Sequence, residues 1–202
     1  MPVPTTALAR TAAPLRLAVI VGSVRAGRFG PTVARWFAER AAGRGDMTVD
    51  TVDLADAGTL PLEMSAPPGG ADEGPGLTAR LAAADAFAVV TPEYNHSYPA
   101  ALKNVIDWHH KEWHAKPVGF VSYGGVSGGL RAVEHLRGVF AELHAVTVRD
   151  TVSFHSAWSG FDDAGRPLDA EGSGGAATTM LDQLAWWGDV LREARAARPY
   201  TA

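Results

Sequence analysis

The chain has 202 residues, of which 47% are apolar and 20% charged, and its formal net charge is −4 at neutral pH. This length suits one domain with a substantial core, and no apolar run approaches the roughly 18 to 20 residues of a membrane helix. Because no apolar run is long enough, we expect no membrane span. The arginines are scattered rather than clustered, so we expect no nucleic-acid binding. The absence of cysteine excludes thiol nucleophiles, disulfides and thiolate metal sites, and we expect a cytoplasmic protein.

The first segment, residues 1–14, holds three prolines and shows no helical or strand period. It also lacks an apolar block of the length that a signal peptide requires. We therefore predict a disordered tail over residues 1–14, followed by a single domain over residues 15–197.

The predicted domain opens with an apolar strand at Leu15–Val21. A turn rich in glycine and arginine follows, and a helix begins at Pro31. Met47–Leu54 alternates apolar and polar residues, as a half-buried strand does. The acidic segment Ala55–Gly76 is rich in glycine and proline, which predicts a long loop.

Strands and helices continue to alternate along the rest of the chain. Further strands are predicted at Ala86–Thr91, Pro117–Tyr123 and Ala145–Phe154. The remaining helices are predicted at Leu77–Ala84, Pro99–Trp108, Gly128–Leu143 and Thr178–Ala197. Because the central strands are apolar throughout, both faces of the sheet should be covered by helices. The leading topology is a flavodoxin-like α/β three-layer sandwich with five parallel strands in the order 2-1-3-4-5.

In a doubly wound sheet, ligands bind at the carboxyl ends of the strands where the winding reverses, here between the first and third strands. Three unusual loops should meet there, at Gly22–Gly30, Pro92–Tyr98 and Ser122–Gly129. The first loop leads into a helix N-terminus and carries a serine and two arginines, which suits a phosphate group. The Walker motif and the G-x-G-x-x-G fingerprint are both absent from it.

The other two loops suit a flat ring. The second, PEYNHSY, begins with Pro92, which stops the strand, and its main-chain groups could read the polar rim of a heterocycle. Tyr94 or Tyr98 could cover the face of that ring. A capped turn held by Asn95 or Ser97 is compatible with this interpretation. The third loop has glycine at four of six positions, which favours close approach of main chain to another object.

Three segments, GSVRAGRFG, TPEYNHSYPAALKNVIDW and SYGGVSGGLRA, resemble in this order and spacing the NADPH-dependent FMN reductase family of flavodoxin-like proteins. The resemblance covers about residues 15–155. It implies that the FMN phosphate is held by Ser23, Arg25, Arg28, Phe29 and Gly30. It implies that the isoalloxazine ring is bordered by Pro92, Glu93, Tyr94 and Asn95 on one side and by Ser122, Tyr123, Gly124, Gly125 and Ser127 on the other.

The resemblance also implies an activity. Hydride would pass in a ping-pong reaction from NADPH or NADH to FMN and then to a small-molecule acceptor, such as a flavin, a quinone, an azo compound or a metal ion. No side-chain acid or base is required, so we name no catalytic residue and no metal ligand. Related proteins commonly pair through the helix after the second motif. Exposed Trp108 and Trp113 would then support a homodimer or homotetramer.

Two other functions are compatible with the sequence. Ser127 lies in a G-x-S-x-G turn, and Asp150 and His155 follow in the chain order of an α/β-hydrolase triad. A flavin-binding electron carrier without reductase turnover is the second alternative. His110 and His114 stand four residues apart, but no third metal ligand is evident, so a solvated helix end is favoured over a metal site.

Overall fold

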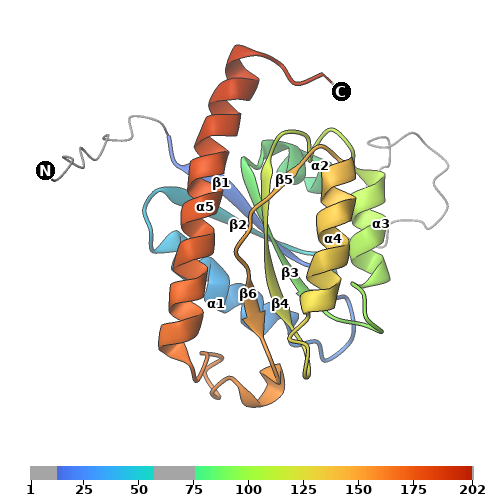
Figure 1. Cartoon of the computed structure of the whole chain (residues 1–202), viewed down its shortest axis with the longest axis vertical. Coiled ribbons are helices and arrows are strands. Elements are labelled where there is room, and N and C mark those ends of the chain that lie inside the picture. Colours follow the sequence, from blue (N-terminus) through green and yellow to red (C-terminus); the bar gives the residue numbers. More distant parts are fainter. Residues whose placement is uncertain (1–12, 57–75, 202) are drawn as a thin grey trace, which may run out of the picture.

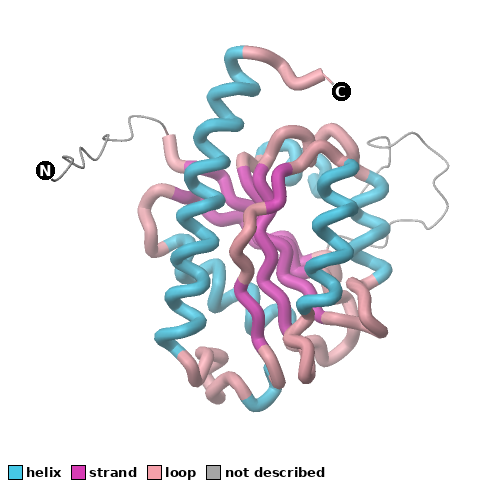
Figure 2. Tube along the Cα trace, viewed as in Figure 1, coloured by secondary structure: helices cyan, strands magenta, loops and turns pink. Residues whose placement is uncertain are grey.

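A computed structural model describes residues 13–56 and 76–201. The central parallel sheet has the order β2-β1-β3-β4-β5, with β6 also paired to β4. This is the predicted flavodoxin-like order, and helices cover both faces of the sheet (Figures 1 and 2). Residues 1–12 of the predicted tail and residues 57–75 of the predicted long loop lie outside the described residues. That residues 15–197 form a single domain stays a prediction.

The inner strands are the apolar runs of the sequence. They are β1 (Leu15–Val21), β3 (Ala86–Pro92) and β4 (Pro117–Tyr123), and every residue of β3 and β4 is buried. Full burial follows from helices on both faces, which leave no polar side for an alternating pattern. The edge strand β2 (Met47–Asp53) mixes buried and exposed residues, alternating over its first four residues only, and it pairs with β1 from Leu15↔Met47 to Val21↔Asp53.

Two apolar clusters fill the space between the sheet and its helices. On one face, α1 (Gly30–Ala42) and α5 (Ala170–Ala197) pack against β1, β3 and β4. On the other face lie α2 (Leu77–Ala83), α3 (Ala100–Trp108) and α4 (Leu130–Glu142). The last helix begins eight residues before the predicted start, at Ala170 rather than Thr178, and Asp169 caps it by accepting from the Gly172 N–H at 2.9 Å.

The predicted strand Ala145–Phe154 is interrupted. It forms β5 (Val146–Thr147) and β6 (Val152–Phe154), and residues 148–151 span the same stretch as residues 119–120 of β4. This detour has its own partners, because Arg137 donates to the carbonyls of Val148 and Arg149 at 2.8 Å each. The apolar pattern of the segment could not reveal these extra residues, because Val148 remains buried inside the detour.

The expectation of exposed tryptophans after the second motif was wrong. α3 ends at Trp108, and His109 takes an extended conformation that turns the chain back toward the sheet. Trp108 and Trp113 are 2% and 0% exposed, and Trp113 packs against Phe87 with ring centroids 4.7 Å apart. Both rings pack in the core of their own chain and give no evidence for an interface. A homodimer or homotetramer therefore stays a prediction.

Replacing Trp113 with alanine should lower the free energy of unfolding by about 3 to 5 kcal/mol, because it removes a fully buried ring. Trp186→Ala is the matched control, since that ring is 60% exposed and its loss should change stability by about 0.5 kcal/mol or less. Urea denaturation measures both. A midpoint that varied with protein concentration in the unaltered protein but not in Trp113→Ala would instead place this ring at an interface.

Candidate functional site

The sheet register brings the three predicted loops together at the carboxyl edge. Val21 pairs with Val90, and Pro92 pairs with Tyr123, so β1, β3 and β4 end at the same level. The loops then contact one another. The hydroxyls of Ser23 and Tyr94 lie 2.7 Å apart, and Ser127 donates to Glu93 at 2.8 Å.

The first loop offers unused main-chain donors. Among the described residues, none accepts a hydrogen bond from the backbone N–H groups of residues 23–27. Arg25 is exposed and has no carboxylate partner within the same described part of the chain. Consecutive free N–H groups before a helix N-terminus form a concave anion site, and a nearby guanidinium strengthens it.

Arg28 is differently placed from Arg25. Its Nη2 atom donates to the Asp53 carboxylate at 2.6 Å, and the side chains are 20% and 18% exposed. Its buried Nε atom has no partner in the described residues. A buried guanidinium donor normally has an acceptor, so this atom is a donor at the first loop that no described residue uses.

Three hydroxyls close the space behind this loop. Ser23 is fully buried between Tyr94 and Tyr123. Burial raises the pKa of the Tyr123 phenol, and the neighbouring Tyr94 raises it further, whereas hydrogen bonds from Ser23 and the Gly30 N–H lower it. Tyr123 therefore stays a neutral phenol at physiological pH. Phe29 packs on its edge with ring centroids 6.1 Å apart.

The second loop turns tightly. Tyr94 and Ser97 exchange main-chain hydrogen bonds of 2.8 and 3.0 Å, and Asn95 and His96 between them have φ of 50° and 69°. Two consecutive left-handed residues define a type I′ turn, which is costly for a residue such as His96. The N–H groups of Glu93, Asn95 and His96 have no hydrogen-bond acceptor in the described ranges, so main chain faces outward here.

Glu93 joins this turn to the next loop. Its side chain is 8% exposed, and Arg131 Nε donates to it at 2.8 Å. The hydroxyl of Ser127 and the backbone N–H of Arg131 donate to the other carboxylate oxygen at 2.8 and 3.2 Å. A second nitrogen of Arg131 contacts His96. Arg131 therefore positions both loops, and sequence analysis missed it because nothing in a helix pattern indicates a partner 38 residues away.

In the third loop, main-chain atoms pack closely against the end of β4. A Cβ on Gly129, where φ is 85°, would lie 2.8 Å from the Cβ of Ser122. The Ser122 hydroxyl is buried and donates to the Gly128 carbonyl at 2.8 Å, so it holds the loop from inside. A Cβ on Gly125 would meet no atom within 4 Å, so this glycine borders open space. The Gly124 N–H donates to the Phe154 carbonyl at 3.1 Å.

Residues 155–169 form a further wall that was not predicted from the sequence. Phe161 packs edge-on against Phe29 with ring centroids 5.1 Å apart. His155 Nδ1 lies 2.7 Å from the Val126 carbonyl, which ties this wall to the third loop. Val126 of the third loop is 93% exposed, and Trp158 within the wall is 68% exposed. No motif signals these contacts, because each depends on the fold bringing distant segments together.

The hydrolase triad is not assembled. Ser127 donates to Glu93, His155 bonds the Val126 carbonyl, and Asp150 bonds Gln183 and Arg149. The proposed base therefore contacts neither the nucleophile nor the acid, as a triad requires.

Two further checks concern metal ions and the membrane. Within the described ranges, no group of three or more His, Asp or Glu side chains could hold a metal ion. None of the helices described here has both the length and the apolar character needed to cross a membrane.

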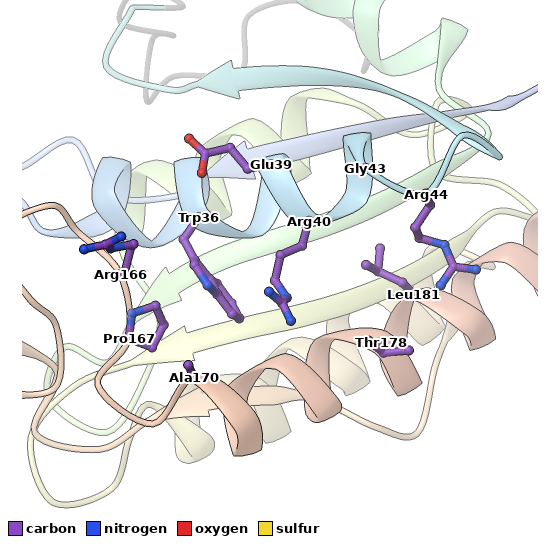
Figure 3. A pocket seen from close by; sticks show the side chains of 10 residues that line it. All are labelled: Trp36, Glu39, Arg40, Gly43, Arg44, Arg166, Pro167, Ala170, Thr178 and Leu181. Atoms are coloured by element: carbon purple, nitrogen blue, oxygen red, sulfur yellow. The ribbon is translucent and has the colours of Figure 1, made fainter.

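A separate cavity of about 530 Å³ lies between α1 and α5. Figure 3 shows Trp36 and Arg40 of α1 directed toward α5 across this groove. Arg40 lies over the Trp36 ring at 5.6 Å from its centroid. No residue of the three loops lines this groove, so it is distinct from the switch-point site.

The fold and the convergent loops define a flavodoxin-like α/β protein with its polar loops gathered at the switch point. Residues 15–159 match the family described as NADPH-dependent FMN reductase. The chain therefore belongs to the NADPH-dependent FMN reductase family, which confirms the resemblance seen in its three motifs.

Individual relatives agree with this assignment. An NAD(P)H-dependent FMN reductase of Schizosaccharomyces pombe is 42% identical over 123 residues, which are 56% of this chain and 60% of that protein, less than two thirds of its length. A 2-hydroxy-1,4-benzoquinone reductase of a Burkholderia species is 32% identical over 86% of this chain and 96% of its own. The fold of the NAD(P)H:acceptor oxidoreductase FerB from Paracoccus denitrificans matches with a TM-score of 0.66 and 23% identity, over 87% of this chain and 98% of that one.

Arg131→Ala should lower the free energy of unfolding by about 1.5 kcal/mol, because the buried Glu93 carboxylate loses its charged partner. Arg149→Ala is the control, because that side chain is 89% exposed and its ion pair with Asp150 should contribute about 0.5 kcal/mol or less. Urea denaturation of both variants gives the comparison. Equal losses would mean that Glu93 does not depend on Arg131.

Proposed function

We propose that this protein is an FMN-dependent NAD(P)H oxidoreductase that passes hydride to a small acceptor, with quinones as the favoured class. Family membership supports the cofactor and the hydride donor. The names of the relatives, an FMN reductase and a benzoquinone reductase, support the acceptor class. The observation that carries the proposal is the run of unpaired backbone N–H groups over residues 23–27 beside Arg25, seen among the described residues.

The first loop would hold the FMN phosphate. Main-chain N–H groups can donate to its oxygens without a folding cost, because they make no other hydrogen bond in the described part of the chain. Arg25 would add a charge-assisted bond, and the unpartnered Nε of Arg28 a second donor. Ser23 could join them with its own hydroxyl hydrogen while accepting from the Tyr94 hydroxyl. Phe29 and Gly30 complete the turn.

The other loops would border the ring. The N–H groups of Glu93 and Asn95 are oriented by the tight turn and by the Glu93–Arg131 ion pair. Pro92 and Tyr94 flank them. On the other side, the open approach at Gly125 leaves room for a flat ring against main chain. Ser122 and Tyr123 support that wall from inside, while Gly124 and Ser127 fix its ends.

When bound, FMN supplies the chemistry, accepting hydride from NADPH or NADH and delivering it to the acceptor in a ping-pong sequence. The protein's own part is to bind and orient. The Glu93 carboxylate accepts three hydrogen bonds within the protein, so it is committed to loop geometry rather than to proton transfer. We assign no catalytic side chain.

Arg25→Ala should weaken FMN binding about ten- to a hundredfold, since it removes a charge-assisted hydrogen bond worth roughly 1.5 to 3 kcal/mol. Arg149→Ala changes another exposed arginine, away from the three loops, and should leave the dissociation constant unchanged. Quenching of FMN fluorescence during titration measures both. An unaltered affinity in Arg25→Ala would remove this residue from the phosphate site.

Adding NADPH under argon to the FMN-loaded protein should bleach the visible flavin absorption, and 2-hydroxy-1,4-benzoquinone should then restore it. Arg25→Ala at limiting FMN serves as the matched low-occupancy control. If FMN binds but neither NADPH nor NADH bleaches it, the protein is an electron carrier rather than a reductase.

A further inference from the structure

A cavity of about 580 Å³ lies at the amino end of β4, at the opposite end of the sheet from the three loops. In Figure 1 this is the end near the C-terminus, where α5 finishes. Its lining includes Lys111, Lys116 and Arg195, with Glu112 as the one acidic side chain among its described lining residues. Such an excess of positive charge stands out on a chain whose net charge is −4.

The one buried carboxylate near the cavity offsets only part of this charge. Asp85 lies behind the cavity with its side chain 8% exposed, and it is shared among the guanidinium groups of Arg16, Arg192 and Arg195 at 3.6 to 3.7 Å. Lys111 is exposed and has no ion pair with any described residue. The cationic groups therefore outnumber the carboxylates around the cavity.

Lys116 and His114 both line the cavity, and each has hydrogen-bonding capacity that no described residue uses. Lys116 is 6% exposed and donates to the carbonyls of Leu81 and Ala82 at 3.0 and 2.9 Å. An ammonium has three donors, so one N–H has no oxygen acceptor among the described residues, and the Nζ atom also lies 5.4 Å from the centroid of the Phe87 ring. The Nε2 atom of His114, which also lines the cavity, is buried and has no partner in the described residues.

We propose that this cavity binds a small divalent oxyanion, such as sulfate or phosphate, held by Lys111, Lys116 and Arg195 with His114 as a further donor. The site is independent of the FMN site at the other edge of the sheet. The cavity volume exceeds that of the inorganic ion, so the oxyanion group of a phosphomonoester would also fit.

Proton uptake should accompany binding. Burial lowers the pKa of His114, and the neighbouring His110, His144 and Lys111 lower it further, with Glu112 opposing them. Burial also lowers the pKa of Lys116 to about 8, and Arg195 contributes in the same direction. A bound anion favours the charged form of both groups and so raises both pKa values. Affinity must then rise as pH falls through the His114 pKa.

Other titratable and charged groups also face His114. His144 follows α4, and its Nδ1 lies 2.9 Å from the Tyr200 hydroxyl. The Tyr200 ring lies 5.7 Å from that of His114. Because the histidines are near one another, each protonation hinders the next, and an anion in the cavity relieves this repulsion.

Sulfate is the probe, because it stays divalent over the pH range used and isolates the titration of the protein. Histidine NMR spectra of the full chain, with the His114 resonance assigned from His114→Gln, are followed during sulfate titration at constant ionic strength. We expect a saturable shift of the His114 resonance and tighter binding at pH 6 than at pH 8. Ribose 5-phosphate then replaces sulfate at the same ionic strength. Tighter binding of the ester identifies a phosphomonoester site, and equal binding a free-ion site.

Lys111→Glu should weaken sulfate binding about tenfold, because it reverses an exposed charge at the cavity mouth without touching the core. Arg149→Glu makes the same charge change elsewhere and should have no effect. A His114 resonance that moves no more than in sodium chloride, or equal effects of the two variants, would overturn the proposal. Repeating the titration in Arg25→Ala keeps the result independent of FMN binding, because that variant lacks the arginine proposed to bind phosphate at the first loop.

Discussion

The parallel register of β1, β3 and β4 is the constraint on which the candidate site depends. Because Val21 pairs with Val90 and Pro92 with Tyr123, the three strands leave the sheet at one level, and the residues after each of them must share the same space. Close packing on both faces favours this register, since a slip of one residue would carry each side chain to the opposite face, where it would meet different helices and a core of different shape. The polar loops are thus placed by the core and not by their own contacts.

The loops are then locked by polar contacts that the core does not supply. The Ser23–Tyr94 hydroxyl pair joins the first loop to the second, and Glu93 joins the second to the third through Ser127 and Arg131. A buried carboxylate is tolerated only when its oxygens are hydrogen-bonded, and Glu93 meets this requirement. With side chains satisfying one another, the main-chain N–H groups of residues 23–27, Glu93, Asn95 and His96 remain available within the described part of the chain. A preformed site of this kind avoids the cost of ordering loops on binding.

Apolar runs predicted the strands because burial on two faces leaves a continuous apolar stretch, which is visible in sequence, and the alternation of strands with helices then favoured the sheet order. It failed where the outcome depends on a local turn. The HHKEWH segment carries a tryptophan beyond a helix end, and only the extended conformation of His109 shows that Trp113 returns to the core. In the site, the three loops were predictable from composition. The pairing of Arg28 with Asp53 and of Glu93 with Arg131 was not, because sequence carries no signal for a partner 25 or 38 residues away.

The carboxyl and amino edges of the sheet differ in the partial charges that the surrounding helix ends present. Helices that connect parallel strands run back along the sheet, so their N–H ends lie at the carboxyl edge and their carbonyl ends at the amino edge. Cations at the amino edge are therefore expected as partners for carbonyls, and Lys116 does donate to the carbonyls of residues 81 and 82 in the last turn of α2, while Arg195 donates to the Ala115 carbonyl in a turn. Capping alone explains neither Lys111, which has no ion pair in the described chain, nor the buried Nε2 of His114. These two groups distinguish an anion site from a set of helix caps.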